Sequence, residues 1–116
     1  MASDPKVFEV VLLLPNDEER ELAVRANEHI WDAAFNAGIT LPALCHQGRC
    51  LTCAGKLEAP GEVDQSDSVS YYRQDREAGF VLLCTAKPRS PLKIRTHQQT
   101  EMRDHRLQQG LPAPYS

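Results

Sequence analysis

The sequence lacks the features that would point to a membrane or a nucleic acid. No apolar run in its 116 residues approaches the length that a membrane-spanning helix needs. Its 13 basic and 16 acidic residues give a net charge of −3, without the basic excess of a nucleic-acid-binding domain. It also has no Gly-rich phosphate loop, no nucleophile elbow and no metal-binding box. We therefore expect no enzymatic activity from the chain by itself.

Targeting signals, repeats and low-complexity tracts are also missing. The first residues, Met1 to Asp4, have neither the apolar core of a secretory signal nor the composition of a transit peptide. We therefore expect a bacterial cytoplasm, or an organelle if a targeting segment has been removed. The hydrophobic content of 41% and charged content of 25% are ordinary for a globular protein. The length suits one domain with its own core.

Only four cysteines are present, and three of them lie in one short stretch. Cys45, Cys50 and Cys53 follow the spacing C-x4-C-x2-C, and Cys84 comes much later in the chain. This is the spacing of plant-type 2Fe–2S ligands, so it predicts that the four thiolates hold such a cluster. Gly48 would allow a sharp bend between the first two cysteines.

Other uses of the four cysteines fit this pattern less well. Structural zinc usually takes two C-x2–4-C knuckles, and Cys84 has no second ligand beside it. Two disulfides would suit a secreted protein, whereas the first residues of this sequence lack a secretory signal. A thioredoxin-like pair at Cys50 and Cys53 would leave the other two cysteines unexplained. A Rieske centre needs two histidines, whereas the loop has only His46.

Hydrophobic patterning predicts a protein that mixes strands with one main helix. The helix is expected over 28–37, with Asn27 as N-cap and Gly38 as its end. Trp31 and Phe35 on this helix are expected to pack in the core. Asp67 is expected to cap a short helix that runs through Tyr71 or Tyr72. Expected strands cover 6–14, 21–25, 56–59, 80–83 and 92–96.

The C-terminal part of the sequence forms a separate polar stretch. We divide the chain into a domain over residues 1–97 and an extension over residues 98–116. Residues 100–109 predict one polar helix, with Gly110 as its stop and a flexible end beyond it. The acidic and basic residues of this stretch balance each other. It is either a frayed, solvated end or an appendage for a particular partner.

Several stretches together resemble the plant-type 2Fe–2S ferredoxins, above all the photosynthetic carriers of cyanobacteria and plants. They are GITLPALC, CHQGRCLTCAGK, GEVDQSD, GFVLLC and IRTH, within residues 6–97. The resemblance implies an α+β, β-grasp fold, a mixed sheet with one main helix packed across it. It implies that Cys45 and Cys50 hold the more exposed iron, and Cys53 and Cys84 the other. The electron would leave at the edge beneath residues 43–51.

The same resemblance implies a monomeric, soluble carrier that moves one electron at a time on a low-potential 2Fe–2S cluster. Its partners would be an electron donor and a reductase or reductive enzyme. Three alternatives stay open at this point. The chain could be an ordinary photosynthetic ferredoxin that feeds ferredoxin–NADP reductase, the ferredoxin of an oxygenase system, or a cluster-based sensor.

Departures from the family pattern bear on the choice of partner. His46, Arg49 and Leu51 replace the usual arginine, small residue and serine, and Ala43–Leu44 replaces a Tyr–Ser pair. Photosynthetic ferredoxins meet basic partner surfaces with carboxylates, and an aromatic position that contributes there falls on Ser70. The remaining acidic support is Glu58, Glu62, Asp64 and Asp67. We therefore expect a partner other than the main photosynthetic reductase.

Overall fold

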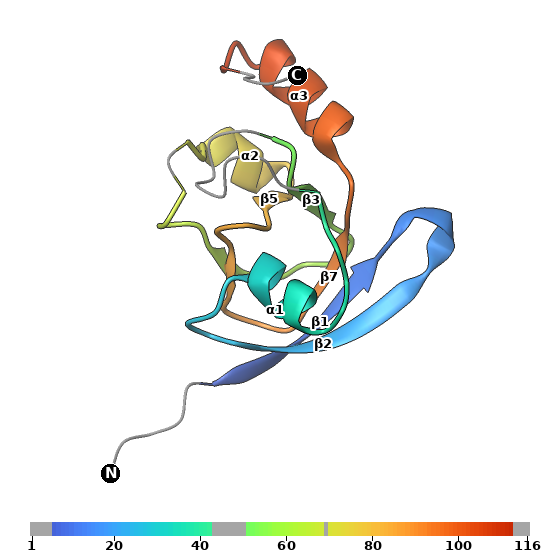
Figure 1. Cartoon of the computed structure of the whole chain (residues 1–116). Helices are drawn as coiled ribbons and strands as arrows, with labels where there is room; N and C mark the ends of the chain where they lie inside the picture. Colours follow the sequence, from blue (N-terminus) through green and yellow to red (C-terminus); the bar gives the residue numbers. More distant parts are fainter. Residues whose placement is uncertain (1–5, 43–50, 69, 113–116) are drawn as a thin grey trace.

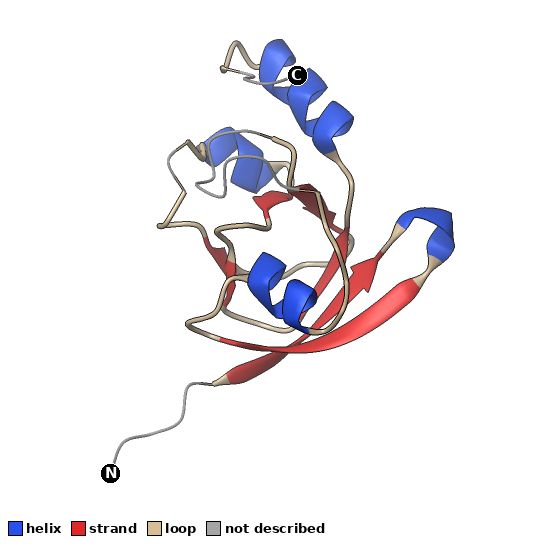
Figure 2. Cartoon of the chain, viewed as in Figure 1, coloured by secondary structure: helices blue, strands red, loops and turns tan. Residues whose placement is uncertain are grey.

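A five-stranded mixed sheet forms the centre of the molecule (Figures 1 and 2). The structure is a computed structural model, and it describes residues 6–42, 51–68 and 70–112. The strand order is β2-β1-β7-β3-β5. The pair β1–β7 is parallel and the other three neighbouring pairs are antiparallel. The strands are β1 (Val7–Leu13), β2 (Glu19–Arg25), β3 (Ala54–Leu57), β5 (Phe80–Leu82) and β7 (Leu92–Arg95).

The remaining elements surround this sheet. A single turn of 3-10 helix, η1, joins β1 to β2, and a second sheet of two strands pairs β4 with β6. Helix α1 packs across the large sheet, whereas α3 lies beside α2 and β3 (Figure 1). This arrangement confirms the predicted β-grasp fold. The elements are η1 (Pro15–Asp17), α1 (Ile30–Asn36), β4 (Val63–Asp64), α2 (Arg73–Glu77), β6 (Lys87–Pro88) and α3 (Gln99–Gln108).

Strand register gathers the apolar side chains on one face of the sheet. Val10 lies opposite Leu22 of β2 and Leu92 of β7, and all three are buried. Because side chains alternate along a strand, the next core position on β1 is Leu12, which pairs with Ile94. Helix α1 covers this face with its own buried apolar side chains, Ile30, Ala33 and Ala34.

Helix α1 begins later than the sequence predicts. Asn27 lies in a turn after β2, and the N-cap is His29, whose side chain makes no capping bond. The predicted end is confirmed, because Gly38 follows the helix with a φ of 84°. The N–H of Gly38 donates to Phe35 and that of Ile39 to Ala34, the two bonds of a Schellman motif.

Two side-chain expectations are wrong. Phe35 is 59% exposed instead of buried, although its ring stacks on the half-buried Trp31 at 5.5 Å. Asp67 caps no helix, because α2 starts only after Tyr72. Its carboxylate instead contacts His29 at 2.8 Å and the Lys87 ammonium at 2.9 Å. These partners join the start of α1 to β6, and a charged pair of this kind outweighs a local cap.

The polar helix expected near the C-terminus is present as α3, one residue earlier than predicted. Gly110 follows it with a φ of 72°. Met102 and Arg106 of α3 are fully buried, so the helix is docked on the domain. Within the described residues, no helix is both long and apolar enough to cross a membrane.

Candidate metal centre

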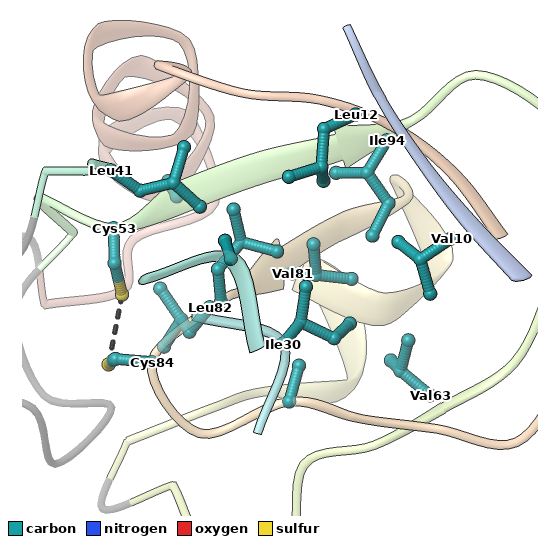
Figure 3. Packing of buried hydrophobic residues seen from close by; sticks show 14 of the residues in the cluster. Val10, Leu12, Ile30, Leu41, Cys53, Val63, Val81, Leu82, Cys84 and Ile94 are labelled. Atoms are coloured by element: carbon teal, nitrogen blue, oxygen red, sulfur yellow. Dashed lines mark hydrogen bonds between the residues drawn. The ribbon is translucent and has the colours of Figure 1, made fainter. Parts of the chain in front are cut away.

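Two of the four predicted ligands lie next to each other at the edge of the core (Figure 3). The Sγ atoms of Cys53 and Cys84 are 3.0 Å apart. A disulfide bond is about 2.05 Å long, so the two sulfurs are not bonded to each other. Both residues are almost completely buried. Cys45 and Cys50 lie outside the described residues, as do Gly48 and the rest of the expected electron exit over 43–50.

Cys53 is held by the turn that leads into β3. The Ala54 N–H donates to the Leu51 carbonyl at 3.0 Å and so closes this turn. Gly55 then lets β3 approach β7 closely, because a Cβ there would lie 2.7 Å from Ile94 Cγ2. A glycine is therefore required two residues after this ligand.

Cys84 is connected directly to the Cys53 segment through the backbone. The Leu83 N–H donates to the Cys53 carbonyl at 3.2 Å and continues the β3–β5 ladder by one bond. The first N–H groups of α1 hold the other side of the Cys84 turn. Those of Ile30 and Trp31 donate to the carbonyls of Ala86 and Leu83, both at 2.9 Å. The first N–H groups of a helix have no acceptor within that helix. The carbonyls of the ligand turn therefore satisfy these donors of α1, and the same hydrogen bonds fix the turn.

Gln65 also fixes this turn, through hydrogen bonds of its side chain. Its side chain is buried, and its Nε2 donates to Ser68 Oγ at 2.8 Å and to Thr85 Oγ1 at 3.3 Å. The two hydroxyls are also hydrogen-bonded to each other at 2.6 Å. Since Thr85 follows Cys84 directly, this network restricts the position of the ligand.

Trp31 also holds the chain as it enters the cysteine loop. Its indole Nε1 donates to the Leu41 carbonyl at 2.9 Å. The sequence predicted only core packing for Trp31, and it assigned no role to Gln65. The stretch GEVDQSD contains Gln65 and was the available signal, but nothing in it showed which residue would turn inward.

Three of the four carboxylates expected to support docking are already engaged within the protein. Glu58 contacts Arg95 at 3.1 Å and Asp64 contacts Arg89 at 2.7 Å, while Asp67 binds His29 and Lys87. A hydrogen bond from Arg95 lowers the pKa of Glu58. Hydrogen bonds from Ser66 lower the pKa of Asp64, and those from His29 and then Lys87 lower the pKa of Asp67. The three groups are thus held as anions beside cations.

Comparison with known proteins identifies the family. Residues 13–89 match the model of the 2Fe–2S iron–sulfur cluster binding domain. Ferredoxin-2 of a Synechococcus species is 42% identical over 87 residues, which cover 75% of this chain and 80% of that protein. The chain belongs to the plant-type 2Fe–2S ferredoxin family. A heterocyst ferredoxin of a Nostoc species is 40% identical over 91 residues, which cover 77% of this chain and 91% of that protein.

A solved structure agrees with this assignment. Pectocin M2 superposes with a TM-score of 0.70 at 26% identity, covering 89% of this chain. The chain spans 40% of that protein, so the likeness extends to one part of it. Like the ferredoxins it resembles, the chain is a one-electron carrier with a 2Fe–2S cluster as its cofactor.

The described half of the site fits this cofactor. Thiolates are the ligands that iron–sulfur clusters take. Cys53 and Cys84 bring two sulfurs together from separate segments, within an apolar surround that limits access of water. Burial and backbone hydrogen bonds are the means by which a protein tunes such a group.

Proposed function

We propose that Cys45, Cys50, Cys53 and Cys84 ligate the cluster, and that the protein passes single electrons from a donor to a redox enzyme other than the main photosynthetic reductase. The bound cluster accepts and releases one electron. The observation that carries the ligand assignment is the 3.0 Å approach of Cys53 Sγ and Cys84 Sγ, two residues that are far apart in the sequence. The C-x4-C-x2-C spacing supplies the other two thiolates.

Hydrogen bonds from the surrounding residues fix the positions of the two described ligands. We infer that this arrangement stays the same during electron transfer. Backbone bonds join the Cys84 turn to α1 and to the Cys53 carbonyl, and the Gln65 side chain donates to Thr85 in the same turn. Rigid positioning is an advantage, since a carrier that keeps its geometry has little to reorganise when its charge changes.

The ion pairs favour a partner without a strongly basic docking surface. Three of the four carboxylates named for docking already face a cation of the same chain: Glu58, Asp64 and Asp67. A partner cation would have to compete with these intramolecular cations. Electrostatic complementarity sets encounter rate and partner choice. We therefore infer weak attraction to basic reductase surfaces.

Replacement of each cysteine by alanine tests the ligand assignment. The wild type should reconstitute with iron and sulfide, absorb in the visible range and give an EPR signal on reduction. Each alanine variant should lose the cluster or hold it poorly, while Thr52→Ala, in the same turn as Cys53, should retain it. Reversible reduction near roughly −400 mV is expected of a plant-type carrier. A colourless, zinc-loaded wild type after anaerobic reconstitution would disprove the assignment.

A further inference from the structure

Arg106 of α3 makes an unusually complete set of contacts for a charged residue with no exposed surface. Its Nη2 donates to Asp75 Oδ2 at 2.9 Å, and its Nε donates to Asp75 Oδ1 at 3.3 Å. Asp75 is also fully buried. Nη2 further donates to the Ser70 carbonyl, and Nη1 donates to the Pro112 carbonyl. A planar guanidinium that donates to one carboxylate and two carbonyls has a fixed orientation, and it also fixes the groups that accept its hydrogen bonds.

These contacts connect α3 to the segment that leads to Cys84. Asp75 lies in the first turn of α2 and accepts the Tyr72 N–H at 3.0 Å, so it also caps that helix. Helix α2 passes directly into β5, whose end delivers Cys84. At the start of β5, the Phe80 ring lies 5.2 Å from the His105 ring of α3. Helix α3 therefore holds this segment at two points, α2 and β5.

The other ligand segment is connected to α3 as well. The Gln98 N–H, at the start of α3, donates to the carbonyl of Ala54 at 3.0 Å, and Ala54 follows Cys53 directly. Met102 of α3 is fully buried in the core cluster that also contains Leu51 and Cys84. The match to the family model ends at residue 89, before α3 begins.

We propose that α3 is a positioning element of the cluster site, and that the buried Arg106–Asp75 pair is the contact through which it acts. The helix joins the Cys53 and Cys84 segments from outside, in addition to the hydrogen bond that links them internally. Removal of the helix should let the thiolates of Cys53 and Cys84 separate and should admit water to the apolar residues around them. Cluster lifetime and reduction potential would then both change. This inference rests on the proposed ligand set.

The test uses one double variant and two controls. In Arg106→Met/Asp75→Asn, no unpaired charge remains buried, and asparagine still accepts the Tyr72 N–H. Replacement of both partners of a buried ion pair by uncharged groups of similar volume avoids the cost of leaving one charge buried without its partner. Leu107→Ala alters the neighbouring exposed side chain of the same helix. Leu22→Ala lowers stability through a core residue of β2, away from α3.

Three properties are measured at a temperature at which circular dichroism shows all variants folded. They are the reduction potential, the EPR spectrum of the reduced form, and the rate at which a chelator removes the visible absorption. The double variant should lose its cluster roughly tenfold faster than wild type, with a shifted potential. Leu107→Ala should match wild type. Leu22→Ala should lower the unfolding midpoint and leave the potential unchanged.

A double variant with the wild-type release rate and potential would overturn the inference. So would a Leu22→Ala protein that changes both properties as much as the double variant does, because the effect would then be one of general stability. A double variant that does not fold leaves the decision to Arg106→Lys, which keeps the charge and loses the fork. Wild-type behaviour of Arg106→Lys would likewise count against the fork. Failure of the ligand set is distinguishable, since the wild type itself would then form no cluster.

Discussion

The side-chain amide of Gln65 pairs with both backbone groups of Leu82. Gln65 Oε1 accepts the Leu82 N–H at 2.7 Å, and Nε2 donates to the Leu82 carbonyl at 3.4 Å. Strand β5 is the last in the sheet order, so this amide acts as the neighbouring strand would at that edge. The unpaired edge of a sheet needs such a partner when it is buried.

Replacement of Gln65 by methionine should therefore loosen the Cys84 turn. Methionine has similar length and no hydrogen-bonding amide, so the buried Leu82 N–H would lose its acceptor. We expect a loss of about 2 to 3 kcal/mol in the free energy of unfolding. Ser68→Ala removes only one partner of the same amide and should cost about 1 kcal/mol. Denaturant unfolding measures both, and equal effects of the two variants would argue against the edge role.

Leu51 has a packing role that accounts for its departure from the family's usual serine. Its side chain is fully buried in the core cluster. Leu51→Ala should therefore cost about 3 kcal/mol, as buried leucine truncations do. Leu51→Ser leaves a similar cavity and adds a hydroxyl donor, so its reduction potential should be higher than that of Leu51→Ala. Voltammetry of the two variants isolates the hydroxyl, and equal potentials would exclude a contribution from it.

The five strands of the large sheet and the end of α1 could be predicted from local patterns, whereas the short strands β4 and β6 could not. The apolar run in β1 and the alternation in β2 carry their own signals, and Gly38 marks a helix end by its tolerance of positive φ. The start of α1 could not be predicted in this way. Its first N–H groups donate to the carbonyls of Leu83 and Ala86, which come more than fifty positions later in the printed sequence.

Most of the contacts that support the site could not be predicted from the sequence for the same reason. The charges of the last helix balance locally, a pattern that is typical of a solvated surface; they belong to Glu101, Arg103, Asp104 and Arg106. Arg106 is nevertheless buried and pairs with Asp75. Asp67 has the side chain of a helix cap, and the distant side chains of His29 and Lys87 engage it instead. The cysteine spacing predicts the ligands from a pattern that can be read in the sequence, whereas these supporting contacts depend on the completed fold.

Tyr71 should make the protein sensitive to strongly alkaline pH. Its hydroxyl donates to the Phe80 carbonyl, and burial raises its pKa from 10.0 to about 12. The neutral form is therefore favoured in the folded protein. Its contribution to stability is complete below pH 10 and is lost as pH rises toward 12, by up to about 2 kcal/mol. Tyr71→Phe should lose about 1 kcal/mol at pH 7 and show a smaller fall above pH 10. Unfolding midpoints from pH 8 to 12 provide the comparison, and parallel curves for the two proteins would contradict it.

Electron transfer to ferredoxin–NADP reductase should be slow and only weakly affected by salt. The carboxylates that would attract a basic surface, Glu58, Asp64 and Asp67, are each paired within the chain. Stopped-flow transfer is measured across an ionic-strength series, alongside a strongly acidic ferredoxin. Salt screens the attraction between opposite charges. A transfer rate that falls steeply with ionic strength therefore indicates that such an attraction assists binding. Fast transfer that falls as steeply as that of the acidic ferredoxin would show this prediction to be wrong.

Release of two of these carboxylates should restore part of the missing attraction. In Arg89→Gln/Arg95→Gln, the partners of Asp64 and Glu58 are neutral, so both anions become available to a basic reductase. We expect transfer to accelerate roughly three- to tenfold at low ionic strength and its salt dependence to become steeper. Lys6→Gln/Arg25→Gln is the matched control, because it makes the same change in net charge at two cations that form no ion pair within the described residues and leaves those two ion pairs intact. If both double variants accelerate transfer equally, net charge alone would explain the effect. If only the first does so, the intramolecular ion pairs are what keeps the reductase from binding well.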